Sequence, residues 1–441
     1  MMAQTSKVKS WLEERLGLSR LMAPLMYKPL SGGARYQFSL GSLNLLLFVN
    51  QALTGIFLMI YYVNSPDHAY DSVKYIQHQV DFGYLVRGLH YWGASAMVVS
   101  VLLHIVRVFI YGAYKKPREI MWVSGTFLML LVFGFAFTGY LLPWDQKSYW
   151  ATVVGTSIPG TMPVFGDLIV RLVRGGIGVS NLTLTRFFSI HVEVLPWLLA
   201  VVAGVHLTVL QIVDHTPPWN PEKAKIEAPF YPDQVFKDMA LFLLVFVGLV
   251  ALANLYPAPL GSVADPTVKT YVPRPEWYFF FLFQLLKFFQ GPYEIVGTMV
   301  LPNLFIILML LLPFYDRNPA IAPKKRPVAM ACIGIFIAGY IALTTMAAVS
   351  GAPGGGPSTV SVSKGKLLFA QLHCDSCHSI NGVGGQVGPP LDKEAENRTR
   401  EWLIAHFKDP QKMSPGSIMP SFNYLTKGQL NELTDYMQSL K

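Results

Sequence analysis

The sequence predicts an all-α protein, in which a polytopic bundle of membrane-spanning helices is followed by a small helical domain. Of its 441 residues, 52% are hydrophobic and 14% are charged, whereas soluble proteins carry about a quarter charged residues. Long apolar segments account for this difference, so most of the chain is expected in a membrane. A stretch rich in glycine and proline near the carboxyl end, followed by a Cys-x-x-Cys-His motif, marks the second domain.

Seven apolar segments are long enough to cross a bilayer, for which a helix needs about 20 residues. The tail before them, residues 1–39, contains a stretch from Ser6 to Leu21 that predicts an amphipathic helix on the membrane surface, with a disordered tail as the alternative. Residues 350–359 are a linker, and residues 360–441 form the second domain. The seven expected spans cover residues 40–62, 85–111, 120–142, 187–213, 238–256, 296–315 and 328–349.

The positive charges predict how the spans are oriented. The tail and the loops 112–119, 214–237 and 316–327 hold twice as many Lys and Arg as the loops on the other side, although they are shorter in total. The amino terminus is therefore expected in the cytoplasm, and seven spans then deliver the second domain to the periplasmic side of a bacterial inner membrane. Orientation in the lipid also explains the net charge of +9, so we expect no nucleic acid as a partner.

Four of the ten histidines fall inside two of the spans. His90 and His104 lie in one span, and His191 and His206 lie in another with one residue more between them. A step of about 14 residues makes close to four helical turns, so each pair shares one face over about 21 Å. The two spans run in the same direction, so His90 meets His191 at the periplasmic level and His104 meets His206 at the cytoplasmic level. Two stacked haems with two histidine ligands each are the simplest interpretation, because zinc needs a tighter cluster of ligands.

Glycines repeat this spacing in two other spans. Gly41 and Gly55 have the same separation as His90 and His104, and so do Gly125 and Gly139. A residue without a side chain lets a porphyrin approach the backbone closely, although helix packing through small residues explains a single such pair equally well. The shared spacing therefore favours contact with the haems.

Two arginines lie three residues outside the first pair of histidines. Arg87 is one turn nearer the membrane surface than His90, and Arg107 is one turn nearer the opposite surface than His104. At these positions a guanidinium can pair with haem propionates, or it can anchor the helix at the membrane surface. We expect the propionate role for both.

A carboxylate lies in the loop before the sixth span. Glu276 belongs to the tetrapeptide Pro275-Glu-Trp-Tyr278, which opens the aromatic stretch 279–281. A carboxylate beside apolar walls near the membrane surface is suited to take up a proton from a hydroquinone. The alternative is an ordinary helix start with an interfacial aromatic belt.

Together these motifs resemble the cytochrome b family of quinol-oxidising complexes. The resemblance covers about residues 30–348 and rests on the two histidine pairs, the four glycines, Gly139-Tyr-Leu-Leu-Pro-Trp144 and Pro275-Glu-Trp-Tyr278. It divides the membrane part into a haem-binding portion with four spans, residues 40–215, and a portion with three spans, residues 216–349. It implies two haems b, and it implies that Glu276 accepts the proton of a quinol near the periplasmic haem.

The resemblance also implies roles for further residues. Tyr278 would assist Glu276, and the quinol would contact Pro275, Trp277 and Ala151, the last standing where mitochondrial-type members carry glycine. On the cytoplasmic side, Asp238 and Gln211 would bind a quinone.

The chain combines features of two branches of this family. Lys115-Lys-Pro-Arg-Glu119 and Trp144-Asp-Gln146 are closest to the plastid-type branch, as is the longer step from His191 to His206. Unlike that branch, the chain continues through a seventh span, and it has Ser39 where the branch holds a cysteine for an additional haem. Phe230-Tyr-Pro232 and Lys237-Asp238 instead resemble the mitochondrial type, in which the aspartate helps to protonate quinone, although the eighth span of that type is missing.

The second domain carries Cys374-Asp-Ser-Cys377-His378, the attachment signature of a c-type haem. Cys374 and Cys377 would form thioethers, and His378 would be one axial ligand. A Cys-x-x-Cys pair alone also fits redox or zinc motifs, but the adjacent histidine and the absence of a second cysteine pair favour haem.

The second axial ligand is expected to be a thioether or an imidazole. Ser414-Pro-Gly-Ser-Ile-Met419 resembles the methionine loop of small single-haem cytochromes c and favours Met419. Gly388-Pro-Pro-Leu391 resembles the loop whose carbonyl orients the ligating histidine. The candidates are Met413, Met419, Met437, His373 and His406.

These features predict a cytochrome b subunit, fused to a cytochrome c domain, of a proton-translocating quinol–cytochrome c oxidoreductase with a Q cycle. One electron from quinol would pass to a high-potential acceptor, and the other would cross the two haems b to a cytoplasmic quinone. The two periplasmic cysteines are both committed to haem c, so we expect a separate Rieske iron–sulfur protein. We further expect a homodimeric complex that delivers electrons through haem c to a cytochrome c or another acceptor.

Two other classes of function remain open. A transmembrane dihaem conduit for a dehydrogenase would need the four histidines but not the Glu276 motif. A transporter with an appended cytochrome would not explain the matched spacings of glycines and histidines.

Overall fold

The long helices begin and end within a few residues of the apolar segments that predict them. A computed structural model describes residues 2–17, 23, 26–267, 271, 274–289, 291–349 and 359–440. Among these residues, seven helices are long and apolar enough to span a membrane, which confirms the predicted number. Their bounds are Tyr36–Tyr61, Gly83–Ile110, Glu119–Tyr140, Asn181–Val213, Phe230–Leu255, Gly291–Tyr315 and Pro327–Val349.

The chain forms two compact units, which we describe separately. The membrane unit comprises Met1–Asp265 and Pro275–Thr344, and the carboxyl-terminal unit comprises Pro266–Arg274 and Thr345–Lys441. The predicted linker 350–359 lies outside the described residues, apart from Thr359 at the start of a helix. The predicted helix over Ser6–Leu21 is observed as α1, Met2–Leu16, and residues 18–21 lie outside the described part.

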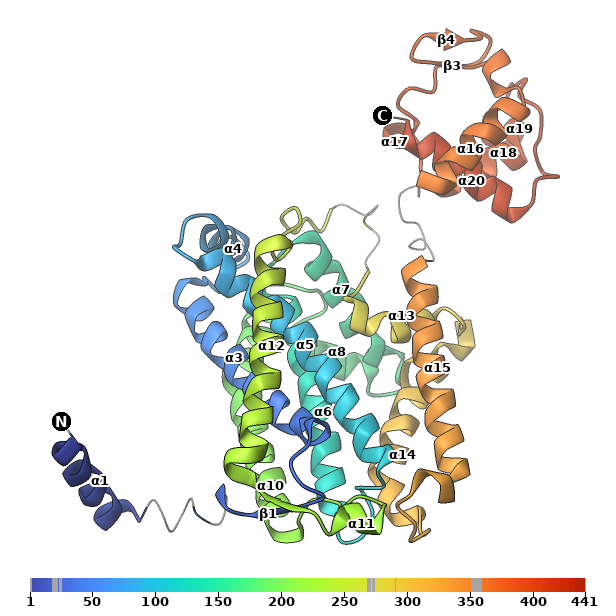
Figure 1. The fold of residues 1–441 in the computed structure, drawn as a ribbon. Coiled ribbons are helices and arrows are strands. Elements are labelled where there is room, and N and C mark those ends of the chain that lie inside the picture. Colours follow the sequence, from blue (N-terminus) through green and yellow to red (C-terminus); the bar gives the residue numbers. More distant parts are fainter. Residues whose placement is uncertain are drawn as a thin grey trace. The chain divides into compact units, whose positions relative to one another are not determined.

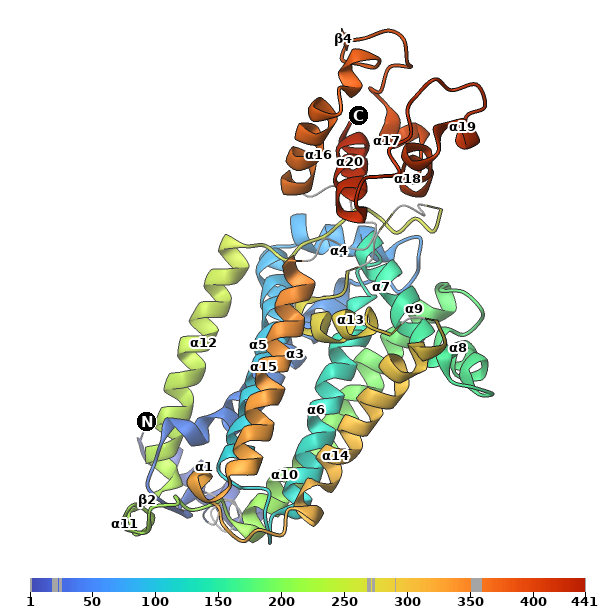
Figure 2. The same cartoon turned by 90° about the vertical axis from the view of Figure 1, so that its right-hand side faces the viewer.

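The spanning helices of the membrane unit run side by side with roughly aligned axes (Figures 1 and 2). Helix α3 packs along α5, α10 along α6, and α12 against α5. The fourth span is composite, because a π-helix at Ile190–Val194 joins α9 to α10. The main helices are α3 (Ser39–Tyr61), α5 (Gly83–Ile110), α6 (Glu119–Tyr140), α9 (Asn181–Ser189), α10 (Leu195–Val213), α12 (Val235–Leu255), α14 (Leu301–Tyr315) and α15 (Pro327–Val349).

Short elements gather at the two ends of this bundle. At one end lie α4 and α7, and at the other lie β1 and α11 (Figure 1). Strands β1 and β2 pair antiparallel and join the amino-terminal tail to the loop before α12, a contact that periodicity in the sequence does not indicate. The short elements are α4 (Ala69–His78), α7 (Gln146–Ser157), α8 (Gly166–Arg174), α11 (Pro221–Ala224), α13 (Phe280–Leu286), β1 (Pro29–Ser31) and β2 (Glu227–Pro229).

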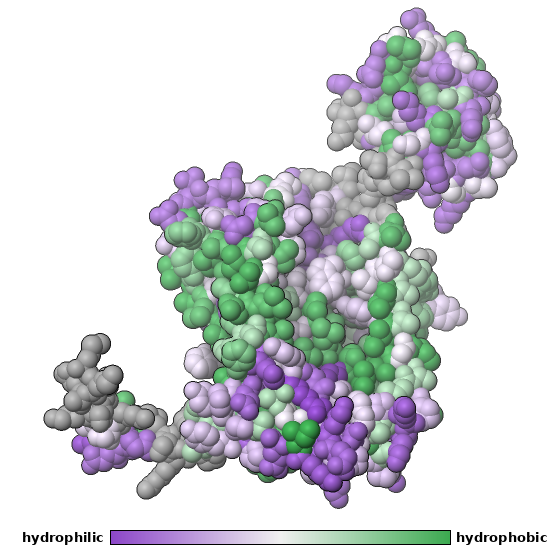
Figure 3. All heavy atoms as spheres, viewed as in Figure 1, coloured by the Kyte–Doolittle hydropathy of each residue, from purple (hydrophilic) through white to green (hydrophobic). Residues whose placement is uncertain are grey.

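The core and the outer surface of the membrane unit are both apolar. Leu47, Val98, Met129, Leu199 and Leu249 are buried together and come from five different helices. The face shown in Figure 3 is largely hydrophobic through the middle of the bundle, with hydrophilic residues gathered towards its ends. Exposed apolar side chains of this kind are what contact with lipid requires.

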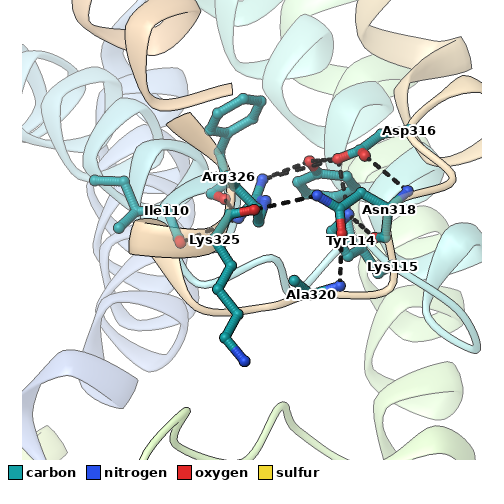
Figure 4. A network of polar contacts seen from close by, with 9 residues as sticks. Ile110, Tyr114, Lys115, Asp316, Asn318, Ala320, Lys325 and Arg326 are labelled. Atoms are coloured by element: carbon teal, nitrogen blue, oxygen red, sulfur yellow. Dashed lines mark hydrogen bonds and ion pairs between the residues drawn. The ribbon is translucent and has the colours of Figure 1, made fainter. Parts of the chain in front are cut away.

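A buried polar network ties the loop after α5 to the loop after α14 (Figure 4). Tyr114 donates to the carboxylate of Asp316, Lys115 forms a 2.9 Å ion pair with the same group, and Arg326 donates to Tyr114 at 2.5 Å. Arg326 also donates to the carbonyl of Phe109 at 3.0 Å. Burial alone would raise the pKa of Asp316, but the hydrogen bonds from Lys115 and Tyr114 lower it. The network therefore stays charged and fixes the hairpin of the last two spans.

The carboxyl-terminal unit is a small helical domain with its own core, as predicted. Helix α16 crosses α20 at Gly365, where a Cβ atom would collide with the backbone of Glu432. Leu403, Leu430 and Leu433 are buried between the helices. The unit contains α16 (Thr359–Gln371), α17 (Glu394–Asn397), α18 (Arg400–Lys408), α19 (Pro410–Met413), α20 (Lys427–Ser439) and a two-stranded sheet of β3 (Ser379–Ile380) and β4 (Val383–Gly384).

Candidate functional site

The four intramembrane histidines form the two pairs that the order of the spans predicts. The ring centroids of His90 on α5 and His191 on the π-helix are 6.4 Å apart. His104 on α5 and His206 on α10 are close enough to interact electrostatically. Metal–imidazole bonds of about 2 Å leave the centroids of two rings on the order of 6 Å apart, so the first pair has room for a bound metal between its rings.

Three of the four histidine rings are oriented by a hydroxyl group. Nδ1 of His90 lies 2.9 Å from the hydroxyl of Thr54, and Nδ1 of His191 lies 3.1 Å from that of Thr138. Each hydroxyl also donates to the carbonyl four residues earlier in its helix, at 2.7 and 2.8 Å. A hydroxyl has only one hydrogen-bond proton, so here it accepts a hydrogen bond from Nδ1–H, and the Nε2 lone pair stays free for a metal.

The same arrangement recurs once at the other level and is absent at the fourth ring. The hydroxyl of Ser124 lies 2.9 Å from Nδ1 of His206. Each of the three hydroxyl residues directly precedes a glycine, whereas Leu40 precedes Gly41, which faces His104. Accordingly, Nδ1 of His104 is buried without a hydrogen-bond partner in the described part of the chain.

Each of the four glycines faces one histidine ring. A Cβ atom at Gly41 would lie 3.4 Å from Cε1 of His104, and one at Gly55 would lie 3.3 Å from Cε1 of His90. At Gly125 the distance to His206 would be 3.4 Å, and at Gly139 a Cβ atom would collide with His191. The shared spacing of glycines and histidines therefore reflects one glycine for each ring, in addition to any contact with a porphyrin face.

The π-helix explains why the step from His191 to His206 is one residue longer than the step from His90 to His104. In an α-helix one additional residue turns the face by about 100°, which would point His206 away from its partner. The wider turn at Ile190–Val194 takes up this residue, and Pro196 at the start of α10 lacks the N–H that would tighten it. The two pairs can therefore face each other at both levels.

The two arginines expected at haem propionates differ in their surroundings. Arg107 stacks on Phe38 and Tyr111, and its Nε and Nη2 atoms are buried with no partner among the described residues. Unpaired buried guanidinium N–H groups one turn from His104 fit an anionic group such as a propionate. Arg87 instead donates to the carbonyls of Ala258 and Pro259, at 2.7 and 2.6 Å, so its propionate role stays a prediction.

Glu276 is buried at the His90 end of the bundle and has two polar neighbours. Its Oε1 atom forms a 2.6 Å ion pair with Nζ of Lys147, and Tyr91, which follows His90, donates to its Oε2 atom at 3.4 Å. The sequence motifs do not single out Lys147 or Tyr91. Lys147 belongs to no motif, and its partner Glu276 lies 129 residues later in the chain, so no local pattern connects the two residues.

The other residues expected at the quinol site lie around Glu276 or along the adjoining helix α7. Trp277 donates to the hydroxyl of Ser95 on α5 at 3.3 Å, and the ring of Tyr278 is buried against Trp277 and Phe279. Ala151 is buried in the middle of α7, the helix that also carries Lys147. Pro275 directly precedes Glu276 in the same loop.

The residues expected to bind a cytoplasmic quinone have separate partners. Asp238 on α12 is buried and accepts a 2.7 Å hydrogen bond from Gln234, which also donates to buried Ser39 at 3.0 Å. Gln211 on α10 accepts from Lys28 through its backbone carbonyl at 2.7 Å. The hydrogen bonds described for these residues therefore do not join Asp238 to Gln211.

In the carboxyl-terminal unit, the loop at 388–391 holds the ring of His378. Nδ1 of His378 donates to the carbonyl of Pro389 at 2.8 Å, as the resemblance implied, and this leaves Nε2 for a metal. A Cβ atom at Gly388 would collide with the same ring. Met419 packs against the hydrophobic core, as Cys374 does.

The thiol chemistry of Cys374 argues against a redox-active Cys-x-x-Cys motif. Burial, with a smaller contribution from the charge of Asp375, raises the pKa of the Cys374 thiol to about 11. Redox-active cysteines react as thiolates and occupy sites that lower the thiol pKa, so the surroundings of Cys374 differ from those of a redox-active cysteine.

Comparison with known families gives matches over both units. The model described as cytochrome b/b6/petB matches residues 25–213, and the model for the carboxyl-terminal part, cytochrome b(C-terminal)/b6/petD, matches residues 263–355. The cytochrome c model matches residues 362–441.

Individual proteins give similar matches. A cytochrome bc complex cytochrome b subunit from Chlorobaculum thiosulfatiphilum is 38% identical over 77% of this chain and 80% of its own length. A cytochrome b/c1 from Bradyrhizobium diazoefficiens is 34% identical over 81% of this chain and 52% of its own length, and a cytochrome b6 from Cyanothece sp. is 42% identical over 47% of this chain and 93% of its own length. A chain of a solved structure, "Hyperthermophilic respiratory Complex III", is 30% identical with a TM-score of 0.69, covering 78% of this chain and 92% of that one.

Proposed function

The chain belongs to the cytochrome b family and continues into a cytochrome c domain, and from this premise we propose that it oxidises quinol in a Q cycle. It is a membrane subunit of a bc-type complex with oxidoreductase activity, as its relatives are. The observation that carries the proposal is the buried Glu276 carboxylate beside Tyr91, the residue that follows His90. This position puts a proton acceptor next to the start of a transmembrane electron path.

We assign the two histidine pairs to two haems b and the Cys-x-x-Cys-His motif to one covalent haem c. Bis-histidine haem supplies a one-electron carrier when it is bound. The protein's part is to hold three of the four imidazoles in the tautomer that presents Nε2, which Thr54, Thr138 and Ser124 do, and to offer Arg107 to an anionic propionate. In the second unit His378 and Met419 would hold the iron of haem c, and the Pro389 carbonyl fixes the ring of His378.

Quinol oxidation needs a group that accepts a proton as the first electron leaves. Glu276 serves as this acceptor and Tyr278 assists it, with Pro275 and Trp277 as walls of the site and Ala151 on the adjoining helix. The first electron leaves towards a Rieske iron–sulfur protein, and the second crosses the membrane from the level of His90 to that of His104. Cys374, Cys377 and His378 would hold a haem c, which would supply a one-electron carrier between that protein and a cytochrome c or another acceptor.

A quinone is reduced at the opposite end of the bundle. Asp238, buried and held by Gln234, is the proton donor there, and Gln211 lies on α10 beyond His206. The end of the bundle that holds the amino-terminal tail faces the cytoplasm, in agreement with the distribution of Lys and Arg. The cytochrome c domain is periplasmic. The complex is a homodimer in a bacterial inner membrane.

The experiment that tests this function is quinol-driven reduction of the b haems in the purified complex. In a Q cycle with the cytoplasmic site blocked, rapid reduction of the b haems requires an oxidised high-potential acceptor, because the two electrons of quinol leave by different routes. A dihaem conduit without a Q cycle reduces its b haems at the same rate when the high-potential carriers are already reduced. The second result would overturn the proposal.

A further inference from the structure

The geometry points to Lys147 as a positioning residue that holds the Glu276 carboxylate ready to accept the quinol proton. Nζ of Lys147 lies 2.6 Å from Oε1 of Glu276, and only a tenth of the Glu276 side chain is exposed. This inference rests on the proposed function of Glu276, but it concerns a different residue on a different helix.

Lys147 occupies a position that helix electrostatics disfavours. It is the second residue of α7, so its charge lies in the first turn, at the positive end of the helix dipole. Asp145, two residues earlier, does not compensate for it, because its Oδ1 atom accepts from the amide of Ser148 at 2.8 Å and its Oδ2 atom from that of Gly261 at 2.9 Å. The anionic partner of Lys147 is therefore Glu276.

Among the described residues, Glu276 also lacks the hydrogen bond that a carboxylate at its position usually forms with the backbone of the following helix. It caps the short 3-10 helix Trp277–Phe279, where a capping carboxylate commonly accepts from backbone amides of the first turn. Its side chain forms no such capping hydrogen bond within the described part of the chain. The carboxylate instead points to Lys147 and Tyr91, which lie on α7 and α5.

The two oxygens of Glu276 are consequently different. Oε1 is engaged at 2.6 Å by an ammonium group, whereas Oε2 has a longer contact of 3.4 Å with Tyr91. We assign Oε2 as the atom that accepts the proton. The O–H bond of the hydroquinone breaks, a new O–H bond forms at Oε2, and the hydroquinone anion gives its electron to the iron–sulfur protein.

Lys147 lies closer to water than Glu276 does. About a third of its side chain is exposed, compared with a tenth for Glu276, so the pair leads from the buried site towards the aqueous end of the bundle. The start of α7 is held firmly, because residues 144–146 form backbone hydrogen bonds with residues 262–264. Lys147 therefore sits on a fixed support at the site.

A double-mutant cycle with the purified complex tests the inference. Lys147→Met should lower kcat for quinol oxidation by about tenfold or more with little change in KM, since misplacement of a catalytic group by about 1 Å costs rates of this order. Lys147→Arg should retain most of the activity, because it restores the ion pair. Lys74→Met, on the exposed surface of α4, is the matched control and should behave as the parent.

The decisive arm combines Lys147→Met with Glu276→Gln. If Lys147 acts through Glu276, its replacement should change the rate less than twofold in the Glu276→Gln background. An equal loss in both backgrounds, or a parental rate for Lys147→Met, would overturn the inference while leaving the role of Glu276 intact. A parental rate for Glu276→Gln alone would instead overturn the proposed quinol site. Unchanged spectra of the b haems in each variant establish that the fold is retained.

Discussion

The hydroxyl oxygen of Thr54 lies 2.9 Å from Nδ1 of His90, and it leaves the other ring nitrogen as the one that can bind a metal. Thr138 and Ser124 do the same for His191 and His206, whereas His104 has no such partner among the described residues. A hydrogen bond at Nδ1–H makes imidazole a stronger donor to its metal. The two levels of the bundle therefore offer different ligand environments. Both histidines of the His90–His191 pair have a hydroxyl at Nδ1, but only one histidine of the His104–His206 pair does.

Removal of the Thr54 hydroxyl should raise the midpoint potential of the b haem bound by His90. Loss of a net hydrogen bond of about 1 kcal/mol corresponds to about 40 mV for a one-electron carrier, and it destabilises the ferric form more. Redox titration of Thr54→Val, with Thr54→Ser as the control that keeps the hydroxyl, measures this shift. The other b haem should titrate as in the parent. Equal midpoint potentials in the valine and serine variants would show that the Thr54 hydroxyl does not change the donor strength of His90.

Replacement of Gly139 should cost one b haem. A Cβ atom at this position collides with the ring of His191, so Gly139→Ala must displace the ligand. Gly204→Ala is the matched control, because a Cβ atom at Gly204 on α10 meets nothing within 4 Å. Pyridine haemochrome analysis should give about half the parental b content per haem c for the first variant and the parental content for the second. Full b content in Gly139→Ala would contradict the pairing of glycines with rings.

Much of this site follows from the sequence because its signals are local. The length of the apolar segments defines the seven spans, and the similar spacing of histidines and glycines predicts which helix faces meet. The hydroxyl partners have a local signal too, since Thr54, Ser124 and Thr138 each precede one of the glycines. In the structure each of these hydroxyls orients the ring that faces the adjacent glycine.

Other features depend on contacts that no short pattern records. The ion pair of Lys147 with Glu276 joins a loop helix to a loop that follows two further spans. The π-helix at Ile190–Val194 does have a trace in the sequence, namely the additional residue between His191 and His206, but spacing alone does not say where the residue is accommodated. The pairing of β1 with β2 involves three residues on each side, too few for a recognisable alternation.

The haem content should be two extractable b haems and one covalent haem c for each chain. Extraction with acidified acetone should therefore leave one third of the haem on the polypeptide. Met419→Ala should keep the covalent haem but lose the absorbance of thioether ligation, with Met413→Ala as the control on the neighbouring segment. Two covalent haems per chain would contradict the expectation that Ser39, which has no thiol, excludes a second covalent haem on the cytoplasmic side.

The buried methyl group of Ala151 should reduce sensitivity to methoxyacrylate-type inhibitors of quinol oxidation. It is part of a closely packed segment that includes fully buried Thr152, and such sites have little spare volume. Ala151→Gly should lower the inhibitor concentration for half inhibition by about an order of magnitude, whereas the rate without inhibitor stays within twofold. Strong inhibition of the parent with no gain in Ala151→Gly would exclude contact between this residue and the inhibitor.

The most direct test of the account is the rate at which quinol reduces the b haem of His90 and His191 in Glu276→Gln. The substitution preserves size and hydrogen bonding but removes the proton acceptor, so all haems should remain bound with parental spectra. Pre-steady-state reduction by quinol should slow by about one order of magnitude or more, the usual scale for loss of a general base. Reduction through the Asp238 side should stay at the parental rate, because that site lies at the other end of the bundle. A parental rate of quinol-driven reduction in Glu276→Gln would contradict the central claim that this carboxylate accepts the proton.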